Sequence, residues 1–373
     1  MKNLAPYQIL FPFGFFAALL GAGLWLWPEP AFLGVPVQWI HSKLMIGCFL
    51  WSFITGFLMT AIPRMTGTKS SSDAEVLWML ALLILSTLTA FWADGAWFQG
   101  VQIVLALSLM GFALSRLMRK TKTVPVFFSH VGLALGLALA GRIFALLGHS
   151  WMGFFLADVG VLLLLVLGIG TRFYSFLSGL PSKFEQAPPV HRKWFHFLGV
   201  VLAAFLVFAG VWRQAWAYAG LFVLSLIYLQ FVWKVFRMSA RSSALKWIMR
   251  IVAFCIPSAF LLCALRPDLY LIGLHILFIG VFGMITFAVA SRVILAHGSY
   301  PLEMETRSKA LWAFLALIMV SLALRLLYGF SEGTLREVSL KGAAIFWLAA
   351  LGVWCWSFGL KTFFKGELAK PAC

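Results

Sequence analysis

The sequence predicts an all-α integral membrane protein, a polytopic bundle of about twelve transmembrane helices. Of its 373 residues, 62% are hydrophobic and 11% are charged, whereas soluble proteins average about 25% charged residues. The hydrophobic residues form continuous runs of about 20, the length that an α-helix needs to cross a hydrocarbon core of about 30 Å. A transmembrane β-barrel would instead show short segments of alternating hydrophobicity. Because no loop is long enough for a soluble domain, residues 1–373 are predicted to form a single membrane domain.

Charged residues, prolines and glycines separate the predicted spans. The first span follows only a weakly charged start and has no clear cleavage pattern, so it is expected to be a retained helix. Spans 3 and 4 form a tight hairpin around Asp94 and Gly95, and spans 9 and 10 form another around Pro267. In order, the predicted spans are residues 8–27, 43–62, 75–92, 96–116, 125–145, 150–173, 194–211, 215–236, 247–265, 269–295, 308–328 and 340–364.

Lys and Arg residues predict the orientation of these spans. Most of the 29 lie at the two termini and in the loops that follow even-numbered spans. Positive residues mark the cytoplasmic side of a membrane protein, so both termini are expected in the cytoplasm. The net charge of +17 then reflects topology and contact with membrane lipid, and no nucleic-acid binding is expected.

An arginine closes three of the spans at regular intervals. Arg64, Arg172 and Arg292 end spans 2, 6 and 10, at spacings of 108 and 120 residues. This pattern predicts three four-helix pseudo-repeats, over about 1–116, 125–236 and 247–364. The alternative is that each arginine simply reaches the phosphates at the membrane interface.

Histidines at the other ends of these spans are the first candidate ligands. His41 and His149 each precede their arginine by 23 residues, while His275 precedes Arg292 by 17 and is expected about 9 Å deeper. Neutral imidazole binds both haem iron and copper. If the three spans line one region, His41 and His275 are the expected axial haem ligands and His149 a further metal ligand. Each histidine could equally be an interfacial side chain.

Three other residues compete for a functional role. Asp158 is the carboxylate within the predicted spans, and it is interpreted as a proton relay, a partner of a histidine or a hydrated side chain. His130 and His297 lie towards the cytoplasmic side and are the alternative metal ligands. The sequence leaves open whether this inner pair or the outer three histidines bind metal.

Three motifs resemble those of one known family. His41 followed by LMIGCF, together with GFLMTAIPRMTG at 56–67, resembles the opening motif of the NnrS family, and SRVILAHG at 291–298 resembles its second signature. A weaker match is Gly-Thr-Arg-Phe at 170–173 with Phe176. The resemblance covers the whole chain. Residue by residue, it supports His41, Arg64, Arg172, Arg292 and His297.

The chain also departs from the family pattern. The first motif usually has two histidines and an acidic residue, but here Ser42 and Lys43 follow the single His41. Ala296 stands where a glycine usually precedes the late histidine. The chain therefore resembles a divergent member.

The resemblance implies a function. NnrS proteins are polytopic membrane proteins associated with haem, copper and the bacterial response to nitric oxide. The chain is therefore expected in the bacterial inner membrane, with haem, copper as a second metal, nitric oxide as a small ligand and an unidentified electron donor. If it is an enzyme, it is expected to be an oxidoreductase that acts on nitric oxide.

Two alternatives remain from the sequence: a membrane transporter or channel without redox chemistry, and a metal-dependent membrane assembly factor. Three quartets of spans also resemble the catalytic subunit of haem–copper oxidases. The paired histidines of those enzymes are absent here, which argues against oxygen reduction.

Overall fold

The structure, a computed structural model, describes residues 5–178, 189–235 and 243–364, and nearly all of them are helical. In these residues, twelve helices are long and apolar enough to cross a membrane, which confirms the predicted polytopic helical bundle. Most boundaries agree to within a few residues. The second span is longer than predicted and starts at Val37, and the last runs over Gly333–Ser357.

The chain divides into two compact units. The first comprises residues 1–122, 243–245 and 286–373, and the second comprises 123–242 and 246–285. The first boundary coincides with the loop predicted between the first two quartets of spans, whereas the third quartet is shared between the units. The threefold repeat stays a prediction.

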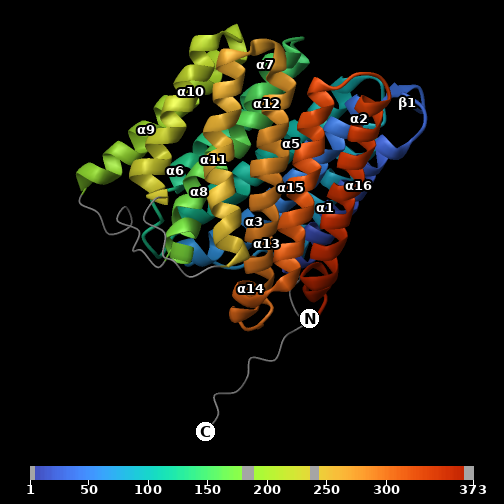
Figure 1. Cartoon of the computed structure of the whole chain (residues 1–373). Helices are drawn as coiled ribbons and strands as arrows, with labels where there is room; N and C mark the ends of the chain where they lie inside the picture. The colour runs from blue at the N-terminus through green and yellow to red at the C-terminus, as the bar shows by residue number, and fades with distance from the viewer. Residues whose placement is uncertain (1–4, 179–188, 236–242, 365–373) are drawn as a thin grey trace. The chain divides into compact units, whose positions relative to one another are not determined.

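The first unit has a short hairpin at one end and α14 at the opposite end (Figure 1). Its main helices are α1 (Pro6–Gly23), α2 (Val37–Ser42), α3 (Trp51–Thr66), α4 (Asp73–Ala90), α5 (Gly95–Met118), α13 (Met284–His297), α14 (Glu303–Arg307), α15 (Lys309–Phe330) and α16 (Gly333–Ser357). Between or after them lie η1 (Leu24–Leu26), β1 (Ala31–Phe32), β2 (Val35–Pro36), the π-helical η2 (Lys43–Leu50) and η8 (Gly359–Thr362).

Aromatic rings fill the core of the first unit. Phe53 stacks on Phe11 at 4.6 Å between ring centroids, and Phe287 contacts both Phe53 and Trp354. The buried indole N–H of Trp354 donates to the hydroxyl of Ser291 at 2.8 Å. Offset and edge-on ring pairs of this kind stabilise a core beyond the burial of their area. They join α1, α3, α13 and α16.

The second unit is helical over all of its described residues apart from short connections. Its elements are α6 (Phe128–Leu146), α7 (Ser150–Phe154), η3 (Phe155–Gly160), α8 (Val161–Ser178), α9 (Pro189–Trp212), α10 (Ala215–Ile227), η4 (Tyr228–Trp233), α11 (Ala244–Leu265), η6 (Pro267–Leu269), α12 (Tyr270–Leu277) and η7 (Phe278–Gly283). Helix α6 crosses η3 closely, since a Cβ on Gly141 would lie 2.6 Å from the backbone nitrogen of Ala157. Only glycine permits that approach.

Spans 2, 6 and 10 share a local feature. Each consists of a short helix, a π-helical segment (η2, η3 or η7) and a longer helix that carries Arg64, Arg172 or Arg292. They are also the most buried spans, with 72%, 83% and 67% of the window buried, against at most 50% for the others in the described residues. π-Helical segments are rare and occur frequently at functional sites. The spans chosen from the sequence are thus structurally distinctive.

Candidate functional site

His41 lies in α2, near one end of the first unit. Its Nδ1 is 2.8 Å from the carbonyl oxygen of Gly21, and the ring of Trp25 contacts it edge-on at 5.2 Å. A carbonyl oxygen only accepts, so Nδ1 must carry the hydrogen and Nε2 must hold the lone pair. Nε2 makes no hydrogen bond to any described residue. A backbone carbonyl that fixes one ring nitrogen in this way is a typical partner of a metal-ligating histidine.

Local structure explains the position of His41. The chain reverses in the β1–β2 hairpin, where Leu33 and Gly34 both adopt positive φ, as a two-residue turn requires. Pro36 precedes α2 with extended backbone, and η2 then begins two residues after His41. Lys43, which follows the histidine, donates to the carbonyl oxygens of Ala90 and Trp92 at the end of α4. The ammonium group of Lys43 thus caps the C-terminal end of α4.

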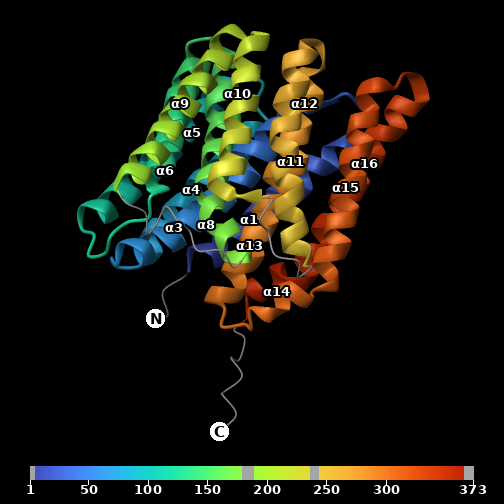
Figure 2. The ribbon, with the colours of Figure 1, turned by 60° about the vertical axis from the view of Figure 1, so that its left-hand side comes forward.

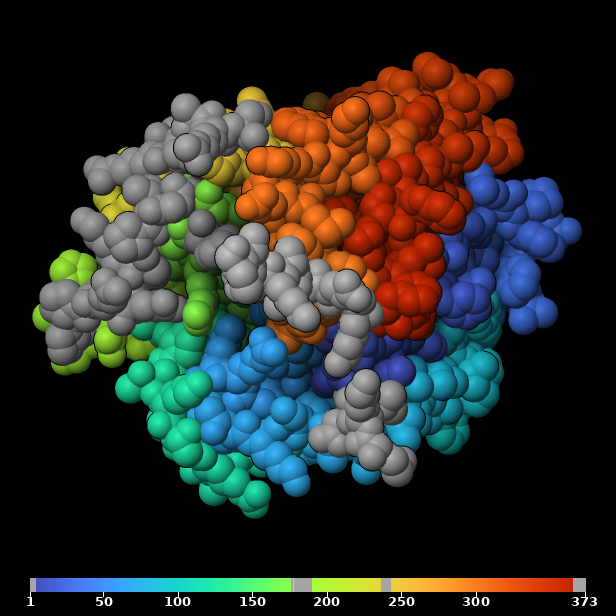
Figure 3. Space-filling model, turned by 90° about the horizontal axis from the view of Figure 1, so that it is seen from below, coloured from blue at the N-terminus to red at the C-terminus, as the bar shows by residue number. Residues whose placement is uncertain are grey.

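The opposite end of the first unit carries the other residues of the family motifs. His297 is the last residue of α13, and its ring lies 5.8 Å from that of Tyr7. Arg64 is exposed and close enough for its charge to act on both rings. Viewed from this end (Figure 3), the orange segment around α14 adjoins the red end of α16 and η8.

Arg292 is held at the same end by an ion pair. Its guanidinium donates to the carboxylate of Glu305 in α14, whose side chain is only 2% exposed. Burial raises the pKa of Glu305, and the charge of Arg292 opposes that effect. The pair fixes the turn between α13 and α15. It shows that Arg292 has a structural partner.

His41 and His297 cannot bind the same metal ion. The helix from His41 to Arg64 is continuous over 23 residues, which corresponds to about 35 Å. His297 lies at the Arg64 end. Metal–nitrogen bonds are about 2 Å long. If both histidines are ligands, they therefore belong to separate sites.

The remaining candidate histidines belong to the second unit. His149 is exposed in the turn between α6 and α7. The Nδ1 of His275 lies 2.7 Å from the carbonyl oxygen of Leu271, four residues earlier in the same helix, so Nδ1 donates there as it does in His41. Arg172 is exposed near the end of α8. Among the residues that the structure describes, no three His, Cys, Asp or Glu side chains gather as a metal site.

His130 is enclosed in a polar chain. The hydroxyl of Ser129 donates to the carbonyl of Val126, so it accepts from Nδ1 of His130 at 3.3 Å and from Nδ1 of His196 at 2.8 Å. Nε2 of His130 then accepts from the hydroxyl of Tyr228 at 2.5 Å. Both ring nitrogens are occupied, and the ring is completely buried. This arrangement argues against His130 as a metal ligand.

Asp158 lies in η3 and is ion-paired with Arg142 of α6. Nη1 of Arg142 is 3.3 Å from one carboxylate oxygen, and Nη2 donates to the other. The two side chains are 4% and 8% exposed, so the hydrated alternative from the sequence is wrong. Two opposite charges in so apolar a place stabilise each other. The sequence did not predict Arg142 as the partner of Asp158, because no local pattern connects residues on different helices.

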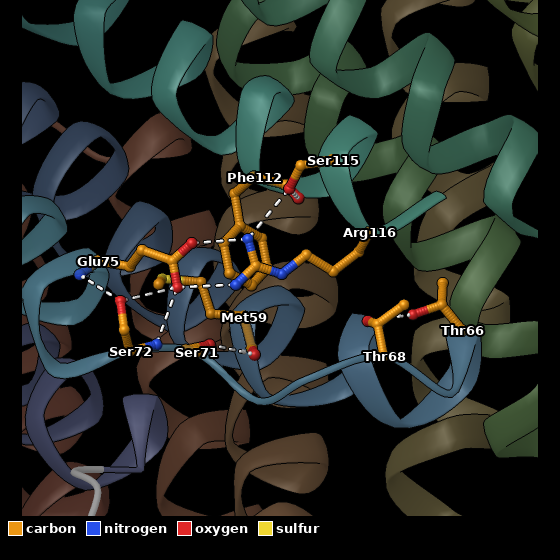
Figure 4. Close-up of polar contacts among 9 residues, drawn as sticks. All are labelled: Met59, Thr66, Thr68, Ser71, Ser72, Glu75, Phe112, Ser115 and Arg116. Carbon is orange, nitrogen blue, oxygen red and sulfur yellow. Dashed lines mark hydrogen bonds and ion pairs between the residues drawn. The ribbon is translucent and has the colours of Figure 1, made fainter. Parts of the chain in front are cut away.

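A second missed interaction fixes the chain just after the first motif (Figure 4). Arg116 forms two hydrogen bonds to Glu75, at 2.6 and 2.7 Å, and stacks on Phe112 at 4.1 Å. Glu75 also completes a capping box with Ser72 at the start of α4. The spacing Ser72-x-x-Glu75 was the local signal that could have predicted the cap, though not the arginine.

These observations define the class of protein: a polytopic helical membrane protein that carries a histidine with a fixed tautomer at one end of its second span. The family model of the NnrS protein matches residues 4–363. The chain therefore belongs to the NnrS family. A comparison with curated proteins gives no match.

Proposed function

We propose that this protein binds haem in the bacterial inner membrane and helps the cell to tolerate or turn over nitric oxide. The family to which the chain belongs is associated with haem and copper. The observation that carries the proposal is the geometry of His41, whose Nδ1 is fixed by a carbonyl and whose Nε2 makes no hydrogen bond within the described chain. Such an imidazole is ready to bind an axial position of haem iron.

His41 is the proposed haem ligand of the first unit, and His275 is the corresponding candidate of the second unit. Each donates its Nδ1 hydrogen to a backbone carbonyl, which assigns the lone pair to Nε2. Bound haem would supply the iron that takes up nitric oxide and exchanges an electron with a donor. The protein's own part is to fix the tautomer of each imidazole and to surround it with apolar helices.

Copper has weaker support from the residues. His149 and His297 remain the predicted further ligands, but no group of three metal-binding side chains is present among the described residues. We therefore derive no chemistry from copper.

An absorption spectrum of the purified protein tests the proposal. We expect a Soret band that shifts when nitric oxide is added and that His41→Ala weakens or abolishes. His191→Ala is the matched control, because His191 is exposed at the start of α9 and has no proposed role. A protein without bound haem would contradict the proposal and favour the transporter or the assembly factor. A Soret band that His41→Ala leaves unchanged would show that His41 is not a haem ligand.

The orientation is part of the same proposal. With both termini in the cytoplasm, an alkaline phosphatase fused after Cys373 should be inactive. An active fusion would show that the orientation is the opposite of the one proposed.

A further inference from the structure

Two arginines gather on one tyrosine at the His41 end of the first unit. In α15 and α16, which run side by side (Figure 2), Arg325 lies 4.3 Å and Arg336 4.7 Å from the centre of the Tyr328 ring. Arg336 also donates to the hydroxyl of Tyr328 at 3.3 Å. The tyrosine thus positions both guanidinium groups, one from each helix of the pair.

A short segment links the helices of this arginine pair to that of His41. The segment η1, which carries Trp25, packs against both α2 and α16 and so links the histidine to the arginines. Trp25 itself contacts the His41 ring.

No acidic side chain of the described residues neutralises the pair. Neither Arg325 nor Arg336 takes part in any of the ion pairs that those residues form, and Glu337, one position after Arg336, is bound to Lys341. Two like charges held against one ring repel each other. A bound anion would remove that repulsion. Guanidinium groups match a carboxylate particularly well, because their planar fork donates two parallel hydrogen bonds.

We propose that Arg325 and Arg336 bind the propionate carboxylates of a haem held by His41. This inference rests on the proposed function and adds the residues that fix the polar edge of the haem. Two arginines of the family motifs are not available for this role. Arg64 lies about 35 Å of helix away from His41, and Arg292 is paired with Glu305.

Haem dimethyl ester, in which both propionates are esterified and uncharged, provides the test. Haem-free full-length protein in detergent is titrated with haem and with the ester, and binding is followed by quenching of tryptophan fluorescence. Wild type should bind haem about 100-fold more tightly than the ester, the lower end of the range for two charge-assisted hydrogen bonds. In the double variant Arg325→Gln/Arg336→Gln, the two affinities should agree to within about twofold.

Two controls complete the experiment. Lys341→Gln removes a positive charge from the same helix and should leave the preference for haem unchanged. Arg325→Lys/Arg336→Lys should keep part of the preference, since charge remains but the fork is lost. Equal binding of haem and ester by wild type overturns this inference and leaves the proposed function intact. If the wild type binds neither haem nor the ester, both this inference and the proposed function are wrong. If the double variant keeps the preference but loses co-purifying anionic lipid, the arginines bind lipid phosphate and the inference is wrong.

Discussion

The ion pair between Arg142 and Asp158 gives the most quantitative prediction. In the wild type, the side chains of Arg142 and Asp158 are only 4% and 8% exposed. In Asp158→Asn, the guanidinium of Arg142 therefore stays buried but loses the opposite charge. Breaking one partner of a buried pair costs about 3–5 kcal/mol. The asparagine carbonyl can still accept one hydrogen bond, so we expect about 3 kcal/mol, which is roughly a 150-fold change in the ratio of folded to unfolded protein.

The assay is equilibrium unfolding of the purified protein by SDS in mixed micelles, followed by tryptophan fluorescence. Asp268→Asn is the matched control, because Asp268 also pairs with an arginine of the second unit, Arg266, but both side chains of that pair are more than half exposed. Its midpoint should stay at the wild-type value, since exposed pairs contribute little. Arg142→Met/Asp158→Leu removes both charges and should recover most of the loss. Equal midpoints for Asp158→Asn and Asp268→Asn would refute the reasoning.

Two further predictions concern the surroundings of His130. Gly168→Ala would place a Cβ 2.7 Å from the Cβ of His130 and should destabilise the second unit by about 1–3 kcal/mol. Gly132→Ala is the control, because its Cβ would meet nothing within 4 Å and should not destabilise the unit. Thermal unfolding compares the two variants, and equal melting temperatures would disprove the close packing at Gly168. Tyr228→Phe removes the donor to Nε2 of His130 and should lower the free energy of unfolding by about 1–3 kcal/mol in the same assay. A variant that loses haem but keeps its stability would contradict the structural role of this hydrogen bond.

The sequence predicted the spans well because the membrane imposes a simple rule. A run of about 20 apolar residues without internal charges can satisfy its backbone in hydrocarbon only as a helix. One exception is the start of the second span, where Gln38, His41 and Lys43 interrupt the apolar run. Lys43 is accommodated there because its ammonium caps the end of α4, a contact between residues 47 positions apart.

The partners of the polar residues could not be predicted in the same way. Asp158 and Arg142 lie on different helices, and Arg116 is 41 positions from Glu75. Whether two such side chains meet depends on how each helix is rotated about its axis, and all these spans are too uniformly apolar to reveal a rotation. For the same reason, no local pattern distinguishes Arg325 and Arg336 from the other arginines and lysines of the chain. Their common partner, Tyr328, emerges from the packing of α15 on α16.

The structure also separates two roles within the family motif. Most of the segment 56–67 serves the fold. A Cβ on Gly56 would meet Phe11 at 2.9 Å, and Gly67, with φ of +70°, ends α3 where Thr121 donates to its carbonyl. Packing and backbone geometry account for both glycines.

His41 differs from these residues. Its Nδ1 is used by the fold, but the lone pair on Nε2 has no structural partner among the described residues. A polar atom that the fold positions and does not use is most simply explained by a ligand. That contrast, rather than membership of the motif, is the reason why we propose His41 as a haem ligand.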